Sequence, residues 1–493
     1  MARVLFVQTE WFEHLGILWL AAAARQAGHS VGILVGRRPG KIVSRLLAAN
    51  PEVVAFSATT GAHRAALAIA AQLRPRFPGK ILLGGPHPTF FPEVIAEPAL
   101  DAICRGEGER ALVDFLGRLD RGEDLAGVPG FWVKAGGEVQ RNPVAELIAD
   151  LDTLPPPARD LLEAADPWFR RDTMQRVMAG RGCPYRCSYC FNQAMQTLVR
   201  GKGPYVRTRS VGHVLAELRE IKRRGKRTIN FVDDTFGLNR SWTLEFLDRY
   251  RAEIGLPFIV NLRPEQADAQ LSRALAAAGC YCAQMGVESA REPLRRRLLG
   301  RAVSDEVLAE GARRLKESGI KLLTYNMVGL PGESLADAAA TLEWNGRMGV
   351  DFPRVSIFQP YPRTLLGDQV LSGARADESP PPAEGEGDSS AVADACSPAQ
   401  VRQALAMAES YFRSSPLAGL PVRRIENLHK LFHLYVRCPR LRPLLLRLCR
   451  LPANPLFDLV FLVSIGLQYR GATNRGLAET LRLGLRNLRA YFS

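Results

Sequence analysis

The sequence has few cysteines and lacks a long uninterrupted apolar run. Nine cysteines among 493 residues exclude a disulfide-stabilised miniprotein. No apolar stretch reaches the roughly 18–20 residues that a helix needs to cross a bilayer. Residues 1–3 lead directly into a strand-like run instead of a signal peptide. Three of the nine cysteines fall within eight positions, which favours a metal site in a reducing compartment. We therefore expect a cytoplasmic protein.

Acidic residues are fewer than basic ones, and the imbalance is concentrated at one end of the chain. There are 65 Lys and Arg against 50 Asp and Glu, which gives a net charge of +15. Residues 401–493 contain 15 of the basic and 4 of the acidic residues, so they supply +11. A basic surface can face nucleic acid, an anionic membrane or solvent. Because these basic residues alternate with Leu, Phe and Val, we expect no nucleic-acid partner.

The first part of the chain alternates short apolar runs with Ala-rich or amphipathic stretches. Such alternation predicts a parallel sheet covered by helices on both faces. We therefore predict a doubly wound, Rossmann-like α/β domain over residues 1–124. The expected strands are 3–8, 30–36, 52–59, 80–84 and 101–105, and the expected helices are 15–27, 42–49, 62–74 and 107–119.

The remainder of the chain divides into four further segments. Residues 125–170 are predicted to be a connector with a small hairpin, and 171–370 a (β/α)6-type partial TIM barrel whose active site lies at the strand carboxyl ends. Residues 371–400 are an acidic, Pro/Gly-rich linker or loop. Residues 401–493 form a mainly helical, basic region. The expected barrel strands are 175–179, 228–232, 258–262, 283–287, 321–327 and 354–358, and the expected C-terminal helices are 428–436, 441–448, 456–467 and 477–488.

The strongest chemical pattern is formed by Cys183, Cys187 and Cys190, spaced C-x-x-x-C-x-x-C after the first barrel strand. Three closely spaced thiolates can bind three irons of a 4Fe–4S cluster. No fourth cysteine is near, since Cys104 lies 79 residues before Cys183 and Cys280 lies 90 residues after Cys190, so one iron stays open to another ligand. A structural zinc site needs four ligands, and the nearest histidine, His213, is 23 residues beyond Cys190. Of the other cysteines, we expect Cys280 and Cys282 to be buried. Cys396, Cys438 and Cys449 lack the spacing of metal ligands.

This region resembles the radical S-adenosylmethionine (SAM) superfamily, in which SAM binds the open iron. The resemblance rests on the three cysteines with Tyr189 before the last, on 231–236 (FVDDTF), on 286–289 (GVES) and on 327–334 (MVGLPGES). It implies a SAM site but names no further catalytic residue. Asp233 and Asp234 could instead cap a helix, and Arg263 could face either the cleft or solvent. The implied SAM-binding residues are Tyr189, Asp233, Asp234, Glu288, Gly329 and Pro331.

The N-terminal region resembles the cobalamin-binding domain fused to a large subgroup of these enzymes, the class B methyltransferases among them. Three turns at the strand ends carry the resemblance, although Thr59 replaces the usual Leu. The D-x-H-x-x-G motif that supplies a histidine to cobalt is absent. We therefore expect cobalamin without a protein histidine on cobalt, and expect His14 to cap or pack the following helix. The implied cobalamin-binding residues are Ser57, Thr59, Thr60, Gly84, Gly85, Pro86, His87, Gly106 and Glu107.

Together the resemblances imply an enzyme that generates a 5′-deoxyadenosyl radical and methylates an unactivated carbon of a small-molecule or lipid-like substrate through methylcobalamin. Two alternatives are a methylation-independent, cyclase-like radical reaction and a cobalamin-binding sensor, although a sensor would leave the three cysteines unexplained. An electron donor such as flavodoxin or ferredoxin is expected. Residues 401–493 either make peripheral contact with the inner face of a membrane or form a helical cap over the barrel mouth with a solvated basic face.

Overall fold

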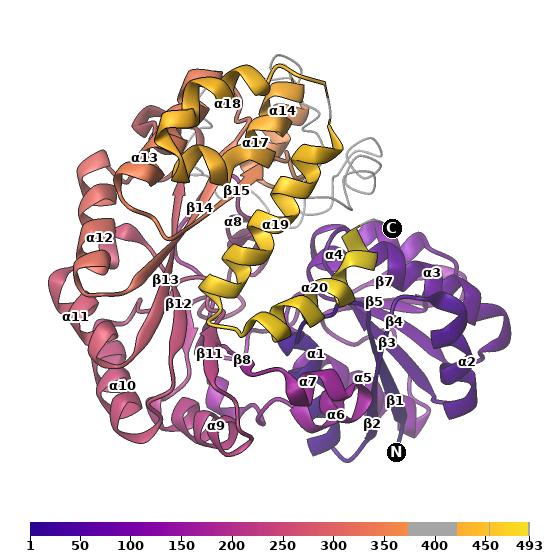
Figure 1. Ribbon diagram of the computed structural model, residues 1–493. Coiled ribbons are helices and arrows are strands. Elements are labelled where there is room, and N and C mark those ends of the chain that lie inside the picture. Colours follow the sequence, from indigo (N-terminus) through magenta and orange to yellow (C-terminus); the bar gives the residue numbers. More distant parts are fainter. Residues whose placement is uncertain (373–421, 453, 492–493) are drawn as a thin grey trace. The chain divides into compact units, whose positions relative to one another are not determined.

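A computed structural model describes residues 1–372, 422–452 and 454–491. Most of the predicted linker 371–400, Cys396 and residues 401–421 lie outside the described residues. The described chain forms two compact units (Figure 1). The first contains Met1–Arg171 and Phe191–Arg207, and the second contains Asp172–Cys190 with residues 208–372 and 422–491. Within the described ranges, no helix has the length and apolarity needed to span a bilayer.

The first unit is built on a seven-stranded sheet with the order β2-β1-β3-β4-β5-β6-β7. The strands β1 to β5 are parallel, and this order reverses direction between β1 and β3, as in doubly wound folds. The predicted doubly wound α/β fold is therefore confirmed. The strands are β1 (Arg3–Gln8), β2 (Ser30–Val35), β3 (Val53–Ser57), β4 (Lys80–Gly84), β5 (Ala102–Cys104), β6 (Phe131–Ala135) and β7 (Glu138–Arg141).

Helices pack on this sheet because the central strands are apolar on both faces. All five residues of β3 are buried, and Leu46, Ile69 and Leu73 pack against the sheet in one core. A strand buried on both sides reads as a continuous apolar run, which is why this one was visible in the sequence. The helices of the unit are α1 (Leu15–Gln26), α2 (Pro39–Ala49), α3 (His63–Leu73), α4 (Pro86–Phe90), α5 (Glu109–Arg121), α6 (Arg159–Ala165), α7 (Pro167–Arg171) and α8 (Phe191–Leu198).

Two segments expected elsewhere join the first unit. The hairpin predicted in the connector forms as β6 and β7, and β6 pairs antiparallel with β5, so it extends the sheet. Helix α8 follows the cysteine motif directly, and its Phe191 ring lies 4.6 Å from that of Phe90. The domain limits inferred from the sequence stay predictions.

The second unit contains a six-stranded parallel sheet in chain order, β8-β11-β12-β13-β14-β15, as the partial barrel predicts. Its apolar core includes Phe231, Phe246, Tyr250 and Phe258, whose rings pack in edge-to-face and tilted contacts. The strands are β8 (Met174–Val177), β11 (Thr228–Phe231), β12 (Phe258–Leu262), β13 (Cys280–Glu288), β14 (Lys321–Val328) and β15 (Phe352–Ile357), with the two-residue strands β9 (Gly180–Arg181) and β10 (Arg207–Thr208).

Helices follow the barrel strands in turn. Several begin at side-chain caps: Ser210, Asn239, Asp268, Ser304 and Ser334 each accept a hydrogen bond from a first-turn backbone N–H. These caps satisfy backbone N–H groups that have no partner within the first turn of a helix. The helices are α9 (Val211–Arg223), α10 (Arg240–Glu253), α11 (Ala269–Ala277), α12 (Asp305–Glu317), α13 (Leu335–Arg347), α14 (Leu365–Leu371), α17 (Val422–Arg437), α18 (Arg442–Leu448), α19 (Pro455–Ala472) and α20 (Leu477–Tyr491).

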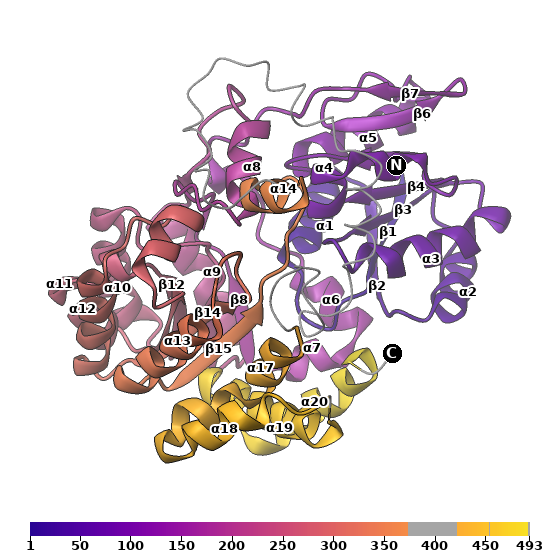
Figure 2. The same ribbon diagram turned by 90° about the horizontal axis from the view of Figure 1, so that it is seen from above.

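The C-terminal helices pack along the last strand and under the amino ends of the barrel strands. Figure 2 shows α17 between β15 and the outer helices α18 and α19. The hydroxyl of Tyr281, near the start of β13, donates to the carbonyl of Gly471 at 2.6 Å. The carboxylate of Glu479 accepts from the backbone and hydroxyl of Thr173, just before β8. The start of α17 lies at the carboxyl ends of the last two strands, because Ile425 shares a core with Val328 and Ile357. A helical cap over the barrel mouth therefore stays a prediction.

Candidate functional site

The predicted SAM-site residues gather at the carboxyl edge of the barrel sheet. Because the six strands are parallel and follow one another in order, the segments after them meet at one edge. The cysteine loop follows β8 and β9, and Arg263 follows β12. Asp233 follows β11, Glu288 ends β13, and Gly329 follows β14.

Neighbouring segments hold the cysteine loop by its backbone. The backbone N–H of Cys190 donates to the carbonyl of Cys187 at 3.0 Å, which closes a turn. The N–H and hydroxyl of Ser188 donate to the carbonyls of Leu299 and Leu298. Gly300 has a φ of 62°, and a Cβ there would lie 3.2 Å from the carbonyl oxygen of Arg186. The segment 298–300 therefore supports the loop from outside the cysteine motif.

The three thiols differ in their surroundings. Cys183 and Cys187 are buried, whereas Cys190 is partly exposed. The Cys183 sulfur lies 3.6 Å from the hydroxyl of Thr235, and burial raises the pKa of the Cys183 thiol. No three His, Cys, Asp or Glu side chains of the described ranges are close enough to share a single metal ion. Three thiols on one loop suit a multinuclear cluster better, because each thiolate then binds its own iron.

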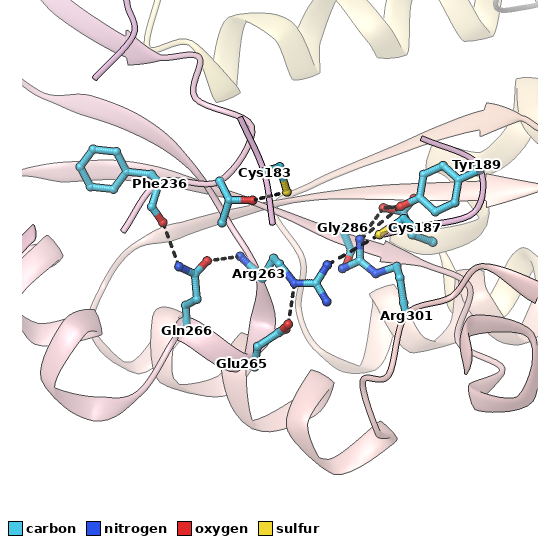
Figure 3. A network of polar contacts seen from close by, with 11 residues as sticks. Cys183, Cys187, Tyr189, Phe236, Arg263, Glu265, Gln266, Gly286 and Arg301 are labelled. Carbon is cyan, nitrogen blue, oxygen red and sulfur yellow. Dashed lines mark hydrogen bonds and ion pairs between the residues drawn. The ribbon is translucent and has the colours of Figure 1, made fainter. Parts of the chain in front are cut away.

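Arg263 faces the cysteine loop, which settles the alternative left open by the sequence. Its guanidinium lies 3.6 Å from the ring centre of Tyr185. Its Nη1 donates to the sulfur of Cys187 at 3.8 Å (Figure 3). Its Nε donates to Glu265 at 2.5 Å, and its backbone N–H donates to the side-chain oxygen of Gln266 at 3.0 Å. Only 8% of Arg263 is exposed. A fixed positive charge is therefore held beside one of the three thiols.

A second network joins the cysteine loop to the end of β13. The hydroxyl of Tyr189 donates to Oε1 of Glu288 at 3.0 Å. Nη1 of Arg301 donates to the same oxygen at 3.2 Å, and Nη2 donates to the carbonyl of Gly286 at 2.8 Å. Burial raises the pKa of Glu288, and Arg301 opposes this rise. The buried carboxyl is thus held in place from the loop and from the segment after β13.

The backbone of this network restricts which residues can occupy positions 286 and 288. Glu288 has a φ of 62°, a left-handed conformation that is uncommon outside glycine. A Cβ on Gly286 would lie 2.4 Å from Oε1 of Glu288 and 2.9 Å from Nη1 of Arg301. Glycine in the G-x-E-S stretch therefore leaves the space that the ion pair occupies.

The two adjacent aspartates have different environments. Asp233 is buried, and its carboxylate accepts from the backbone N–H groups of Ala179 at 3.1 Å and Gly180 at 2.6 Å. Burial raises the pKa of Asp233 to about 7. Asp233 therefore holds the start of the cysteine loop, whereas Asp234 is exposed.

Glu333 gives the loop after β14 its shape. Its Oε2 accepts from the backbone N–H of Gly329 at 2.6 Å and of Leu330 at 3.2 Å. Burial raises the pKa of Glu333 to about 7. Gly329 is buried with a φ of 76°, and Pro331 is half-buried in the same loop. The glutamate of the G-x-P-G-E-S stretch is thus a structural brace for the predicted site residues Gly329 and Pro331.

The cobalamin turns of the first unit also interlock. Gly85 has a φ of 92°, and a Cβ there would lie 2.7 Å from the Ser57 hydroxyl and 2.8 Å from the backbone nitrogen of Ala58. The Thr89 hydroxyl donates to the carbonyl of Gly85 at 2.8 Å and accepts from the N–H of Gly106 at 3.1 Å. The turns after β3, β4 and β5 are therefore linked at one sheet edge. Thr59 and Pro86 are exposed there, and Thr60 and Gly84 are partly so.

Two stacked histidines lie at this edge. The rings of His63 and His87 are 3.7 Å apart at an angle of 10°, and Nδ1 of His87 lies 3.1 Å from the Thr60 hydroxyl. Burial lowers the pKa of His63 to about 4 and that of His87 to about 2, so both rings are neutral at pH 7. Nε2 of His87 is buried with no hydrogen-bond partner in the described part of the chain. This unsatisfied nitrogen and the glycine turn fit a site that a polar ligand completes.

The carboxylate of Glu107 makes its hydrogen bonds within the protein. Its carboxylate receives a bidentate pair from Arg207, at 2.8 Å and 3.0 Å, and the backbone N–H of Ile148 at 2.9 Å. His14, by contrast, lies at the N-cap of α1 without a side-chain capping hydrogen bond.

Comparison with known proteins now identifies the family. The Radical SAM superfamily matches residues 177–344, and the B12 binding domain family matches residues 9–116. The chain is a cobalamin-binding radical SAM enzyme. Iron–sulfur chemistry, SAM and cobalamin accordingly belong to its function, as the sequence predicts.

Curated relatives of this radical SAM enzyme include two methyltransferases and a cyclase. An uncharacterised methyltransferase of Pyrococcus horikoshii is 28% identical over 372 residues, covering 73% of this chain and 78% of that protein. The anaerobic magnesium-protoporphyrin IX monomethyl ester cyclase of Synechocystis is 26% identical over 302 residues, 58% of each chain. The hopanoid C-3 methylase of Methylococcus capsulatus is 30% identical over 231 residues, 45% of this chain and 42% of that protein.

A solved structure supports the fold of the radical SAM enzyme. The radical S-adenosylmethionine methyltransferase TsrM of Kitasatospora setae, with cobalamin and a 4Fe–4S cluster bound, superposes with a TM-score of 0.63. The match covers 91% of this chain and 99% of that one, at 17% identity. At that identity the likeness establishes the fold alone.

Sequence reasoning missed several residues of the site. Arg301 and Glu333 take part through contacts that only the fold creates, and Arg207 lies 100 residues from its partner Glu107. Glu333 had a usable signal, because it stands inside the G-x-P-G-E-S stretch. Arg301 had none, since it lies in a basic segment without a motif.

Proposed function

We propose that this radical SAM enzyme methylates an unactivated carbon atom of a small molecule. The observation that carries the proposal is the cysteine loop at the carboxyl edge of the barrel sheet, held by Arg263 and by the Tyr189–Glu288–Arg301 network, in a chain that also has a B12-binding domain. When bound, SAM at a reduced 4Fe–4S cluster supplies a carbon-centred radical, and cobalamin supplies the methyl group that a substrate radical accepts.

In this proposal Cys183, Cys187 and Cys190 hold the cluster and leave one iron for SAM. The positive charge of Arg263 beside Cys187 stabilises thiolate charge in a buried loop. Because Ser188 is anchored to the backbone of 298–299, the loop keeps its shape while the cofactors bind. Preorganisation of this kind lets the binding groups act without further reordering.

The SAM site is proposed to combine direct contacts with structural supports. Tyr189, Asp234 and Glu288 supply aromatic and polar groups at the strand ends, and the loop with Gly329 and Pro331 supplies backbone groups. Asp233 contributes indirectly, because its carboxylate holds Ala179 and Gly180 in front of the cysteine loop.

The cobalamin site is proposed at the turns with Ser57, Thr59 and Thr60, with Gly84 to His87, and with Gly106. Because Gly85 has no Cβ, its turn can approach Ser57 and Ala58 closely, which brings two of these turns together. Glu107 contributes by fixing Arg207 and Ile148. We keep the prediction that no protein histidine binds cobalt.

The substrate and partners stay proposals. Relatives named as methyltransferases and a hopanoid methylase support a small-molecule substrate, and the latter favours a lipid-like one. An electron donor such as flavodoxin or ferredoxin is needed because the cluster must be reduced. Peripheral membrane contact through residues 401–493 is proposed on the exposed leucines of that region.

A cyclase-like reaction without methyl transfer is the second candidate function. The similarity to the anaerobic cyclase favours it, although the methyltransferase of Pyrococcus horikoshii matches over more of the chain. A cobalamin sensor does not fit, because the superfamily match includes the barrel and all three cysteines.

Methyl-deuterated SAM tests the proposal. The anaerobically purified, reconstituted enzyme is given labelled SAM, a reductant and a metabolite extract of a strain that lacks the gene. Methyl transfer predicts a product that contains three deuterium atoms from the methyl group of SAM. It also predicts that 5′-deoxyadenosine forms in parallel. Formation of 5′-deoxyadenosine with a new product that carries no deuterium would favour the cyclase-like reaction instead.

A further inference from the structure

Exposed large apolar side chains are concentrated on the C-terminal helices. Sixteen such residues occur in the described chain, and ten of them lie between Leu441 and Leu485. The stretch accounts for only a small part of the described sequence, so the concentration is not a general property of the surface. Exposed apolar side chains gathered on a few neighbouring helices are a feature of interaction sites. The ten are Leu441, Leu444, Leu451, Leu456, Leu459, Val463, Leu467, Leu477, Leu481 and Leu485.

On two of the helices these residues form single rows. Leu456, Leu459, Val463 and Leu467 are spaced by three or four positions along α19, so they share one face of that helix. Each is more than half exposed. The buried Phe457 and Phe461 show that the opposite face already packs inward. Helix α20 repeats the pattern with Leu477, Leu481 and Leu485.

Basic residues surround the rows without matching acids. Six exposed arginines lie on or between α17, α18, α19 and α20, and none forms an ion pair with a carboxylate in the described ranges. One of them, Arg437, donates instead to the backbone carbonyl of Asp351 at 2.9 Å. Of the acids there, Asp458 pairs with Lys430 at 2.7 Å, and Glu479 pairs with Arg475 at 3.1 Å. The surface is thus apolar with a positive margin. The arginines are Arg437, Arg440, Arg447, Arg450, Arg470 and Arg482.

We infer that the outward faces of α18, α19 and α20 dock on an anionic phospholipid bilayer. We define this surface, the ten apolar residues with the six arginines, as the docking face. Apolar rows enter the boundary between headgroups and acyl chains, and arginines pair with the phosphate and anionic headgroups around them. No described helix is able to span, so the contact is peripheral. The inference names the lipid partner of a proposed membrane contact and does not depend on methyl transfer.

Charge favours this occupant over the alternatives. A second copy docking through the same face would bring two sets of arginines without carboxylate partners together, which costs free energy by like-charge repulsion. Nucleic acid would pair with the arginines but would leave the leucine rows in water. An anionic bilayer satisfies both features at once.

Vesicle co-sedimentation of the full chain tests the inference. The vesicles contain phosphatidylcholine alone or phosphatidylcholine with phosphatidylglycerol. We expect binding to the anionic vesicles that weakens as salt is added, and little binding to the neutral ones. The triple variant Leu459→Gln, Val463→Gln, Leu467→Gln should bind about tenfold more weakly, because it removes buried apolar area from the contact. The variant Arg440→Gln, Arg447→Gln, Arg450→Gln should lose the preference for anionic vesicles.

The matched controls change the same residue types elsewhere in the second unit. Val307→Gln removes an exposed apolar side chain, and Arg251→Gln with Arg296→Gln removes exposed arginines. Both should bind like the parent chain. Since none of the substituted residues belongs to the cysteine loop or to the proposed SAM site, all variants should retain parental 5′-deoxyadenosine formation. If the parent chain formed no 5′-deoxyadenosine, the proposed function would be contradicted, whereas the vesicle result would still stand.

Three outcomes would overturn the inference. The first is a parent chain that does not bind anionic vesicles, even if a variant with residues 373–421 deleted does bind them. The second is binding that the leucine variant leaves unchanged. The third is a dimer, seen by analytical ultracentrifugation without vesicles, that the leucine variant converts to monomer.

Discussion

The guanidinium of Arg263 lies over the ring of Tyr185, with its central carbon 3.6 Å from the ring centre. Tyr185 stands between the first and second cysteines of the motif, so the stack ties the loop to the end of β12. The same guanidinium donates to the sulfur of Cys187. Stacking, the ion pair with Glu265 and this contact together fix one buried charge beside the thiol.

We predict that Arg263→Gln lowers the reduction potential of the reconstituted cluster. Reduction adds negative charge, which a nearby guanidinium stabilises, and loss of that charge makes reduction harder. A drop on the order of 50 mV corresponds to a little under a tenfold change in a one-electron equilibrium. Redox titration followed by EPR measures it. Arg263→Lys should recover part of the potential but not the stack on Tyr185.

The matched control for this charge is Arg240→Gln. Arg240 pairs with Asp268 at 2.8 Å on the outside of the barrel. Its removal should leave the potential unchanged. An Arg263→Gln enzyme with the parental potential and iron content would contradict the assignment of Arg263 to the cluster.

A second prediction concerns the buried pair of Glu288 and Arg301. Glu288→Ala leaves the guanidinium of Arg301 buried without its carboxylate, and breaking such a pair costs about 3–5 kcal/mol. We expect a clear fall in the melting temperature of the cofactor-free protein. Glu288→Gln should cost less, because the amide oxygen still accepts from Tyr189 and Arg301. Glu310→Ala, on an exposed helix face, should change stability by less than about 0.5 kcal/mol.

The buried carboxyl group of Glu333 predicts a pH dependence of stability. The pKa of Glu333 is raised from 4.5 to about 7 by burial, so the folded state holds a proton that the unfolded state has lost between these pH values. The free energy of unfolding therefore falls as pH rises from about 4.5 to about 7 and stays constant above pH 7. The total loss is about 1.4 kcal/mol for each unit by which the folded and unfolded pKa values differ. Glu333→Gln cannot titrate, so its melting temperature should fall less than the parent's over this window. An equal fall in both proteins would contradict the raised pKa.

The main elements of both sheets could be predicted because their signals are local. Strands such as β3 and β12 are short apolar runs between turn residues, and Ser or Asp caps mark the helix starts. The three cysteines were equally readable, because their spacing alone carries the chemistry. The antiparallel addition of β6 to the sheet was not, since strand pairing depends on contacts distant in sequence.

The partners of the site residues could not be predicted for the same reason. Asp233 was expected near a cofactor, yet nothing local shows that its carboxylate holds Ala179 and Gly180, 54 and 53 residues earlier. Likewise, the environment of Arg263 depends on a loop 76 residues away. Motifs thus located the site, and the fold decided which members brace it.

Gly85 provides a fourth test. Gly85→Ala would place a Cβ 2.7 Å from the Ser57 hydroxyl and impose a φ of 92° on a non-glycine residue. We expect weaker retention of cobalamin and a destabilisation of about 1–3 kcal/mol. Gly122→Ala separates the two causes, because Gly122 has a φ of 65° but open space around it. That control should lose some stability and retain cobalamin.

The stacked histidines lead to a prediction about cobalt. His87 is a neutral imidazole at pH 7, and its Nε2 is buried without a described partner, so it could in principle bind cobalt or donate to the ligand's amide groups. The absent D-x-H-x-x-G motif favours the second role. We therefore expect the EPR spectrum of the bound Co(II) state to show no strong hyperfine coupling to a histidine nitrogen. His87→Phe should leave that spectrum unchanged while weakening cobalamin retention, because the ring keeps its stack on His63 but loses the hydrogen bond with Thr60. A nitrogen coupling that is present in the parent and lost in His87→Phe would instead make His87 a cobalt ligand.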